Sequence, residues 1–314
     1  MDTVAQGLKL SSCPFAGLPG MTTRTSRTAA AKPTPAVKPT AAAKEDAPRL
    51  SLGLRLRAFA LSELGEAQAL LAHPGDSRHD GVHQARKRLR RARAALALGR
   101  KALGREGRRL DEDLGRLCRG LSPLRDAQAL IEGLQRLPAS EPGPLASAMP
   151  DMVALARVRR DGCLARSLAR DPDFQRRRDR LRAMAERLEA LAWLDVKPGA
   201  VARSVARSEE RLAKARRRAT RDPGDDALWH AMRRRLRRVR QQDHLLAALE
   251  PDLRPLAHVT ADEATVLGEA QDDALLLRHC GPHSPFPPPL RKLLRAEARA
   301  RLGRVRTPAP PATA

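Results

Sequence analysis

The chain has 314 residues and a formal net charge of +24, from 60 lysines and arginines against 36 aspartates and glutamates. Only 2% of its residues are aromatic, and none is tyrosine. Good helix formers such as Ala, Leu, Arg and Glu dominate, which favours an all-α protein over a sheet. The charge requires an anionic partner, and the shortage of rings disfavours single-stranded nucleic acid, whose bases stack on aromatic side chains.

Residues 1–48 are rich in Ala, Pro, Thr and Lys, and we expect a disordered basic tail there, with a second disordered tail at 305–314. Either Met1 or Met21 could be the first residue of the natural protein. Between the tails, Pro and Gly separate helical segments. The pattern predicts helices at 50–73, 81–102, 105–120, 122–136, 151–170, 173–194, 200–221, 226–249, 253–268, 269–281 and 290–304, with a loop at 137–149.

Two of these helices carry the same residue order. The pattern H-x-x-R-[KR]-R-L-R-R-x-R begins at His83 and again at His230, 147 residues later. A repeat at a fixed period guides the fold more strongly than local signals do. The sequence therefore predicts a duplicated helical fold.

Each copy divides into an apolar seam and a basic row when it is wound at about 100° per residue. The seams are Val82, Ala85, Leu89, Ala92 and Leu96, and Trp229, Met232, Leu236 and Val239. The rows beside them, with their flanking residues, are His83, Arg86, Lys87, Arg90 and Arg93, and His230, Arg233, Arg234, Arg237 and Arg240. We expect Arg88, Arg91, Arg235 and Arg238 to point elsewhere, toward water.

Such rows are unfavourable by themselves, because like charges three or four residues apart repel on a helix. A polyanion laid along the row would relieve the repulsion and accept charged hydrogen bonds. The simpler interpretation is a solvated basic helix, which the second copy makes less attractive. The helix before the second copy adds Arg207, Lys214 and Arg218 on related sides, so we expect these three to join the binding surface.

An aspartate follows each basic helix at a similar distance. Asp126, in an Arg125-Asp126 pair, and Asp272 are 146 residues apart. Each could pair with and orient an arginine of the cluster, since a buried carboxylate needs such a partner. A position near a helix start, favoured by the helix dipole, explains an aspartate equally well.

These residues resemble the CHAD domain, the conserved histidine α-helical domain. Its pattern is Val-His, an Arg three residues on, and then an Arg-Arg or Lys-Arg pair. Val82, His83, Arg86, Arg90 and Arg91 match this pattern, as do His230, Arg233, Arg237 and Arg238 in the second copy, while Arg125, Asp126 and Asp272 resemble later family residues. The resemblance covers roughly 50–304.

The resemblance implies a CHAD fold, with two tandem four-helix bundles related by pseudo-twofold symmetry and basic helices facing one groove. We expect the domain at 49–304, with repeats at 49–195 and 197–304. The resemblance also implies binding of inorganic polyphosphate and association with polyphosphate granules. No E-x-E-x-K motif of a triphosphate tunnel domain occurs in the sequence, so we expect a stand-alone CHAD protein.

Two other functions stay open. A nucleoid-type DNA- or RNA-binding protein would suit the charge, although no known nucleic-acid motif stands out. An enzyme acting on phosphate chains would need metal-binding carboxylates or a positioned base. We expect no catalysis, because the sequence lacks a Walker-type loop and its paired acids fit a helix surface. Chain-length preference and oligomeric state are not predicted.

The cysteines also bear on the cellular setting. Cys13, Cys118, Cys163 and Cys280 are scattered without metal-ligand spacing or a disulfide framework. They fit a reducing compartment, so we expect a cytoplasmic protein, free or on polyphosphate granules, with no metal or other cofactor. No apolar run approaches the length of a membrane span.

Overall fold

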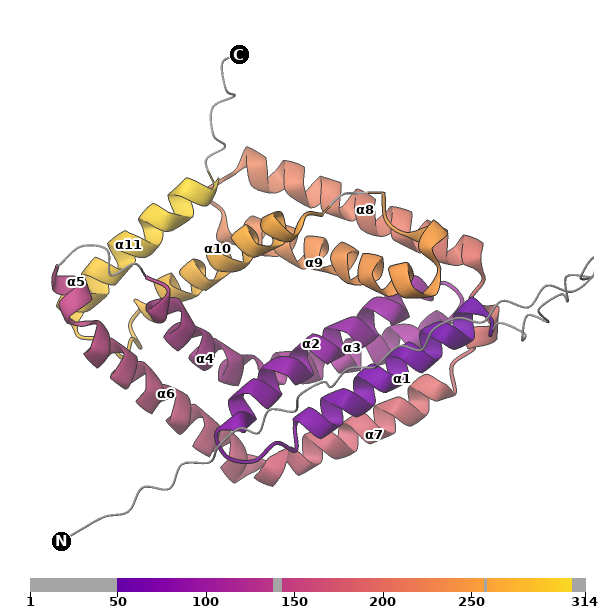
Figure 1. The fold of residues 1–314 in the computed structure, drawn as a ribbon, viewed down its shortest axis with the longest axis horizontal. Coiled ribbons are helices and arrows are strands. Elements are labelled where there is room, and N and C mark those ends of the chain that lie inside the picture. The colour runs from indigo at the N-terminus through magenta and orange to yellow at the C-terminus, as the bar shows by residue number, and fades with distance from the viewer. Residues whose placement is uncertain (1–49, 138–142, 257–258, 307–314) are drawn as a thin grey trace, which may run out of the picture. The chain divides into compact units, whose positions relative to one another are not determined.

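The computed structural model describes residues 50–137, 143–256 and 259–306, and this part of the chain contains helices and no strands (Figure 1). The all-α prediction is confirmed. The predicted tails lie outside the described residues, apart from Val305 and Arg306, which belong to the last helix. The helices are α1 (Leu52–Leu70), α2 (Ser77–Leu98), α3 (Gly104–Gly120), α4 (Ser122–Gln135), α5 (Pro144–Ser147), α6 (Met149–Arg170), α7 (Gln175–Glu189), α8 (Pro198–Arg221), α9 (Asp226–Leu249), α10 (Ala261–His279) and α11 (Pro288–Arg306).

Several helices begin where the sequence offers a cap. The Asp225 carboxylate accepts a hydrogen bond from the backbone N–H of Ala227 at 2.7 Å and so caps α9. The Thr260 hydroxyl does the same for α10, and the Ser51 hydroxyl for α1. Proline stands in the first turn of α4, α6 and α8, where its missing N–H costs nothing.

The first basic helix begins earlier than its sequence suggested. The sequence pattern placed its start at residue 81, but α2 begins at Ser77 and includes this residue. Gly81 instead allows α2 to pack closely against the end of α1. A Cβ atom at this position would lie 2.3 Å from the carbonyl oxygen of Leu70, so only glycine lets α2 lie this close to the end of α1.

The region after α9 also differs from the expectation of two helices at 253–268 and 269–281. Among the described residues early in this region, a 3₁₀ turn forms at Pro251–Leu253. A single helix, α10, then runs from Ala261 through Gly268 to His279. Gly268 does not break it, because a single glycine costs a helix only about 1 kcal/mol, which packing easily offsets.

Four helices from the first half of the chain form most of the largest core, to which α8 and α9 add Val201, Val205, Leu245 and Leu246. Helices α1, α2, α3 and α7 pack side by side, and each contacts two of the others (Figure 1). Each contributes a fully buried leucine: Leu56, Leu89, Leu114 and Leu181. This bundle fixes α2, and therefore one of the two basic rows, on a rigid support.

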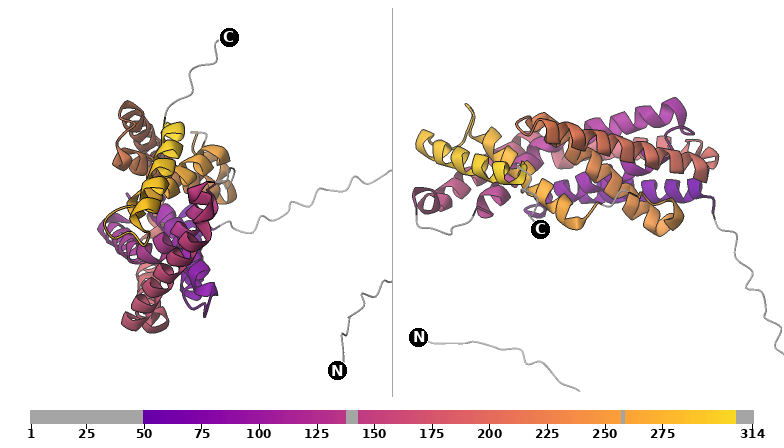
Figure 2. Two further views of the ribbon diagram at one scale, coloured as in Figure 1. Left: turned by 90° about the vertical axis from the view of Figure 1, so that its left-hand side faces the viewer. Right: turned by 90° about the horizontal axis from the view of Figure 1, so that it is seen from above.

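A second core joins the two halves of the chain. Helices α4 and α6 pack with α10 and α11 around Leu130, Met152, Leu276 and Leu294. Figure 2 shows α11 and α5, which contact each other, together at one end of this group. The α8/α9 hairpin packs with α10 through a third cluster that includes Leu212, Leu236 and Leu267. The helices of the second half are therefore not packed as a separate bundle.

The duplication is visible in which helices contact each other. The hairpins α1/α2 and α4/α6 correspond to α8/α9 and α10/α11, and the corresponding helices α2 and α9 contact each other, as do α4 and α10. Helices α3 and α7 have no equivalent in the described part of the second half. The fold therefore brings the two His-Arg helices together but gives them different neighbours.

Candidate anion-binding site

The apolar seams of both basic helices face the cores, as the periodicity predicted. Val82, Ala85, Leu89, Ala92 and Leu96 of α2 are all buried, with at most 2% of their surface exposed. In α9, Met232, Leu236 and Val239 are buried and Trp229 is partly buried. Since the seams are held in this way, the basic rows beside them are turned toward the space between α2 and α9.

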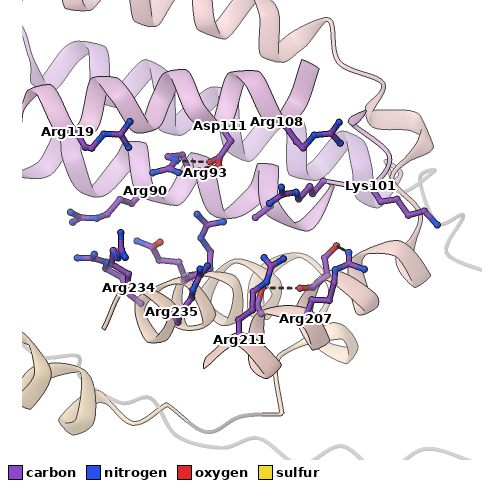
Figure 3. Close-up of a pocket in the computed structure, with 17 residues that line it drawn as sticks. Arg90, Arg93, Lys101, Arg108, Asp111, Arg119, Arg207, Arg211, Arg234 and Arg235 are labelled. Atoms are coloured by element: carbon purple, nitrogen blue, oxygen red, sulfur yellow. Dashed lines mark hydrogen bonds and ion pairs between the residues drawn. The ribbon is translucent and has the colours of Figure 1, made fainter. Parts of the chain in front are cut away.

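A cavity of about 580 Å³, the central basic pocket, lies in this space. Residues of α2, α3, α8 and α9 line it, and Figure 3 shows arginines from α2 and α3 facing arginines from α8 and α9 across it. Its cationic lining residues are Arg90, Arg93, Arg100, Lys101, Arg108, Arg119, Arg207, Arg211, Arg234, Arg235, Arg237 and Arg238. Both halves of the chain contribute to one basic surface.

Only one carboxylate, that of Asp111, is found among the residues that line the pocket. Arg93 donates to both of its oxygens, at 2.7 and 3.2 Å. Within the described part of the chain, none of the other cations of the pocket forms an ion pair. Gly115 of α3 makes room for this contact, since a Cβ atom there would lie 3.2 Å from Cζ of Arg93. The pocket therefore holds a large uncompensated positive charge.

The guanidinium groups of the pocket repel each other in a partly buried setting. Burial, with the charge of Arg237 as the next cause, lowers the pKa of Arg90 to about 9. Burial and neighbouring arginines likewise lower the pKa of Arg237 and that of Arg238 to about 10. All three remain protonated at neutral pH, so the free protein carries an electrostatic strain that an anion would relieve.

The basic surface continues past the pocket toward α4 and α10. Arg86 and Arg125 add to the repulsion on Arg90, and Arg90 and Arg125 add to the repulsion on Arg233. Arg86 donates to the Ser122 hydroxyl at 2.9 Å and also to the carbonyl of Cys118. Arg125 pairs with Glu132 at 2.7 Å. Arg86 and Arg125 are thus fixed in position by the first half of the fold.

The two histidines lie outside the central basic pocket. His83 lines a smaller cavity together with His79, Gln128, Glu132 and Arg160. Burial, followed by the charges of Arg125 and Lys87, lowers its pKa to about 4, so it is neutral at pH 7. In the second half, Nδ1 of His230 lies 2.6 Å from Oε1 of Gln271, and burial lowers its pKa as well. Neither histidine adds positive charge to the free protein at neutral pH.

Some of the remaining predicted cations line the central basic pocket and others do not. Arg207 and Arg234 line the central basic pocket. Lys87, Arg240, Lys214 and Arg218 are exposed and do not line it. Lys214 and Arg218 follow the lining residues of α8 further along that helix, beyond the end of the pocket.

The two aspartates do not share one role. Asp272 pairs with Arg136 at the end of α4, at 2.7 Å, and not with an arginine of the basic rows. Asp126 forms no ion pair with another described residue. Burial raises its pKa, while the charges of Arg278 and Arg86 oppose this effect. The expected pairing with an arginine of the cluster is therefore not found for Asp126, and for Asp272 it involves a different arginine.

Of the four arginines expected to point toward water, Arg91 and Arg235 are exposed, and all four also have other roles. Arg88 and Arg91 approach the buried carboxylate of Glu63 in α1, at 3.4 and 2.9 Å. Their counterparts in the second copy, Arg235 and Arg238, line the central basic pocket instead. The difference arises because α9 packs beside α8, whereas α2 packs beside α1 and its buried glutamate.

Five further cations of the pocket were not predicted from the sequence: Arg100, Lys101, Arg108, Arg119 and Arg211. Arg211 lies one helical turn after Arg207 and could have been found by that spacing. The other four belong to the turn after α2 and to α3, which carry no repeat of the motif. Their contribution depends on how α3 packs.

An all-helical, internally duplicated protein with a shared basic pocket is the class that this fold and site define. The chain belongs to the CHAD domain family, whose model matches residues 60–281. Its fold is also similar to that of the CHAD domain from the plant Ricinus communis, whose crystal structure is known. That similarity has a TM-score of 0.55 at 20% sequence identity and covers 82% of this chain and 90% of the other. No curated protein matches the sequence.

Two further features are absent from the described residues. None of the helices in the described ranges is both long and apolar enough to cross a membrane. Among the same residues, no group of three or more His, Cys, Asp or Glu side chains could hold a metal ion.

Proposed function

We propose that this protein binds inorganic polyphosphate, or another chain of phosphate groups, in the central basic pocket without catalysing a reaction. The observation that carries this proposal is the lining of the pocket, where eleven arginines and one lysine accompany a single carboxylate. Both copies of the His-Arg motif supply some of these arginines. A linear polyanion is the ligand that can contact both sides of such a surface at once.

The energetics support a ligand with closely spaced negative charges. Burial and Arg237 lower the pKa of Arg90, and burial and Arg233 lower that of Arg237. Nε of Arg90 is buried without a hydrogen-bond partner in the described part of the chain. A buried donor without a partner costs about 1–3 kcal/mol. A phosphate oxygen between these arginines would satisfy the donor and offset the repulsion. Arginine suits this role because its planar fork can bind phosphate through two hydrogen bonds.

The chemistry of the lining favours a chain without bases over nucleic acid. None of the seventeen residues that line the central basic pocket is aromatic, so the pocket offers no ring on which a base could stack. Nucleic acid is therefore the secondary candidate. The only carboxylate, Asp111, already accepts two hydrogen bonds from Arg93, which supports binding over acid–base catalysis. Binding of this kind would allow the protein to associate with polyphosphate granules.

Competition between ligands tests this proposal. Fluorescently labelled polyphosphate would be displaced by unlabelled polyphosphate or by duplex DNA, at equal concentrations of phosphate and equal salt. We expect polyphosphate to compete at least tenfold better than DNA. Stronger competition by DNA would reject polyphosphate as the ligand, and release of orthophosphate during the assay with Mg²⁺ present would reject the non-catalytic role.

A further inference from the structure

A second cluster of arginines lies on another side of α3. Residues of α3, α7 and the end of α6 line a cavity of about 610 Å³, the α3/α7 pocket. Its lining includes two aspartates and six arginines: Arg116, Arg170, Arg176, Arg177, Arg180 and Arg187. The His-Arg motif contributes nothing to this pocket, because α3 and α7 lie outside both copies.

Both aspartates of the α3/α7 pocket are already occupied. Asp113 accepts hydrogen bonds from Arg187, at 2.8 Å, and from Arg116. The bond from Arg187 is the main cause that lowers the pKa of the Asp113 carboxyl. Asp171 is buried and accepts a hydrogen bond from Arg177 at 2.7 Å and another from the backbone N–H of Arg176 at 2.8 Å. Neither acid is available to neutralise a further arginine.

Three arginines of the α3/α7 pocket are consequently uncompensated. Within the described residues, Arg170, Arg176 and Arg180 form no ion pair. Arg177 is held in place from two sides, because its guanidinium also lies 5.1 Å from the centre of the Phe174 ring. The pocket combines arginines fixed by the protein with arginines that lack a partner, an arrangement that suits a multiply charged anion.

Helix α3 separates this pocket from the central basic pocket. It presents Arg108, Asp111 and Arg119 to the central basic pocket and Arg116, Leu117 and Gly120 to the α3/α7 pocket. At about 100° per residue, these two sets lie on different sides of the helix. The two pockets share no lining residue. They can therefore be occupied independently.

We infer that the α3/α7 pocket is a second binding site for a segment of phosphate chain, so that one protein molecule holds two segments at once. This inference rests on the proposed function of the central basic pocket. Its consequence is that the protein cross-links phosphate chains, or folds one long chain back on itself, in addition to binding them. The second site belongs to the first half only, since α3 and α7 have no counterpart among the described helices of the second half.

Charge variants of the two pockets test this inference. Arg176→Ala/Arg180→Ala removes two unpaired cations of the α3/α7 pocket, and Arg90→Ala/Arg237→Ala removes two from the central basic pocket. Arg182→Ala/Arg299→Ala is the matched control, because both residues are exposed on helices and line neither pocket. Alanine is the best helix former, so all three variants should fold, which circular dichroism would verify.

Calorimetric titration with tripolyphosphate gives the number of sites. We expect two sites for the wild type and the control and one site for each pocket variant. With long-chain polyphosphate, light scattering should show large assemblies for the wild type and control, and a loss of at least fivefold in scattering for Arg176→Ala/Arg180→Ala.

The outcomes separate the two proposals. If Arg176→Ala/Arg180→Ala keeps the stoichiometry and scattering of the wild type while Arg90→Ala/Arg237→Ala loses all binding, the second site is refuted and the proposed function stands. If Arg90→Ala/Arg237→Ala binds like the wild type, the proposed function itself fails. If poly-glutamate of equal charge displaces tripolyphosphate from the second site at equal concentration, a phosphate-specific site is excluded.

Discussion

Arg90 should destabilise the free protein while it strengthens binding, and these opposite effects can be measured. Burial and Arg237 lower the pKa of Arg90 from the ordinary arginine value to about 9. Each pKa unit corresponds to about 1.4 kcal/mol, so the charge costs the folded protein at most about 5 kcal/mol. The folded pKa lies below the unfolded value. The cost is therefore present at every pH below about 9 and fades as the pH rises toward the ordinary pKa of arginine.

Replacing Arg90 with methionine removes the charge and keeps much of the side-chain volume. Because Arg90 is partly exposed, we expect a gain of about 1–2 kcal/mol in the free energy of unfolding, within the range seen when buried charges are replaced by apolar residues. Affinity for polyphosphate should fall by roughly 10- to 100-fold, the size of one or two charged hydrogen bonds. Urea denaturation measures the first effect and a fluorescence titration the second.

The neighbouring residue Arg91 supplies the control. It pairs with the buried Glu63 at 2.9 Å on the other side of α2. Arg91→Met should destabilise the protein by about 1–3 kcal/mol, because it leaves a buried carboxylate with one weaker partner, and it should leave the affinity unchanged. The reasoning is refuted if Arg90→Met destabilises the protein and binds polyphosphate as tightly as the wild type does.

Salt, pH and the position of Arg93 provide further tests of the site. The binding constant should fall by roughly 10³ or more between 50 and 200 mM salt, as for other proteins that contact many phosphates; a flat dependence in the same titration would exclude a multivalent polyanion. Affinity should change little as the pH falls from 7 to 5, because neither His83 nor His230 lines the central basic pocket and the pKa of His83 is only about 4. The free protein should lose stability over the same range, because the unfolded histidines take up protons near pH 6.5 whereas the folded His83 does so near pH 4. The variant His83→Gln/His230→Gln should bind as the wild type does at both pH values, and a rise in wild-type affinity at pH 5 that this variant lacks would show that the histidines contact the ligand. Gly115→Ala should weaken binding roughly tenfold, since it displaces Arg93 from Asp111, without lowering the melting temperature; unchanged affinity would show that the position of Arg93 is unimportant.

The repeated helix could be predicted from the sequence because its information is local and occurs twice. The apolar seams of α2 and α9 follow directly from helical periodicity, and their burial places the basic rows. Arg90 and Arg237 meet between the halves because corresponding helices contact each other in a duplicated fold. This part of the site could be predicted from the period of the motif and the geometry of a helix alone.

Other parts of the site depend on contacts that no local pattern contains. Arg235 and Arg238 occupy the same positions in the motif as Arg88 and Arg91, yet only the latter meet a buried glutamate, on the neighbouring helix. The arginines of α3 enter the central basic pocket through the packing of a helix that is not repeated. The sequence pattern predicted separate helices at 253–268 and 269–281, whereas one helix, α10, covers Ala261–His279 and the described residues before it form a 3₁₀ turn at Pro251–Leu253.

A crystal structure of the protein with a short polyphosphate tests the central claim most directly. The account predicts one phosphate chain in the central basic pocket, with its oxygens within hydrogen-bond distance of Arg90 from the first half and Arg237 from the second. A chain bound to arginines of one half alone, or to a surface away from both helices, would contradict it.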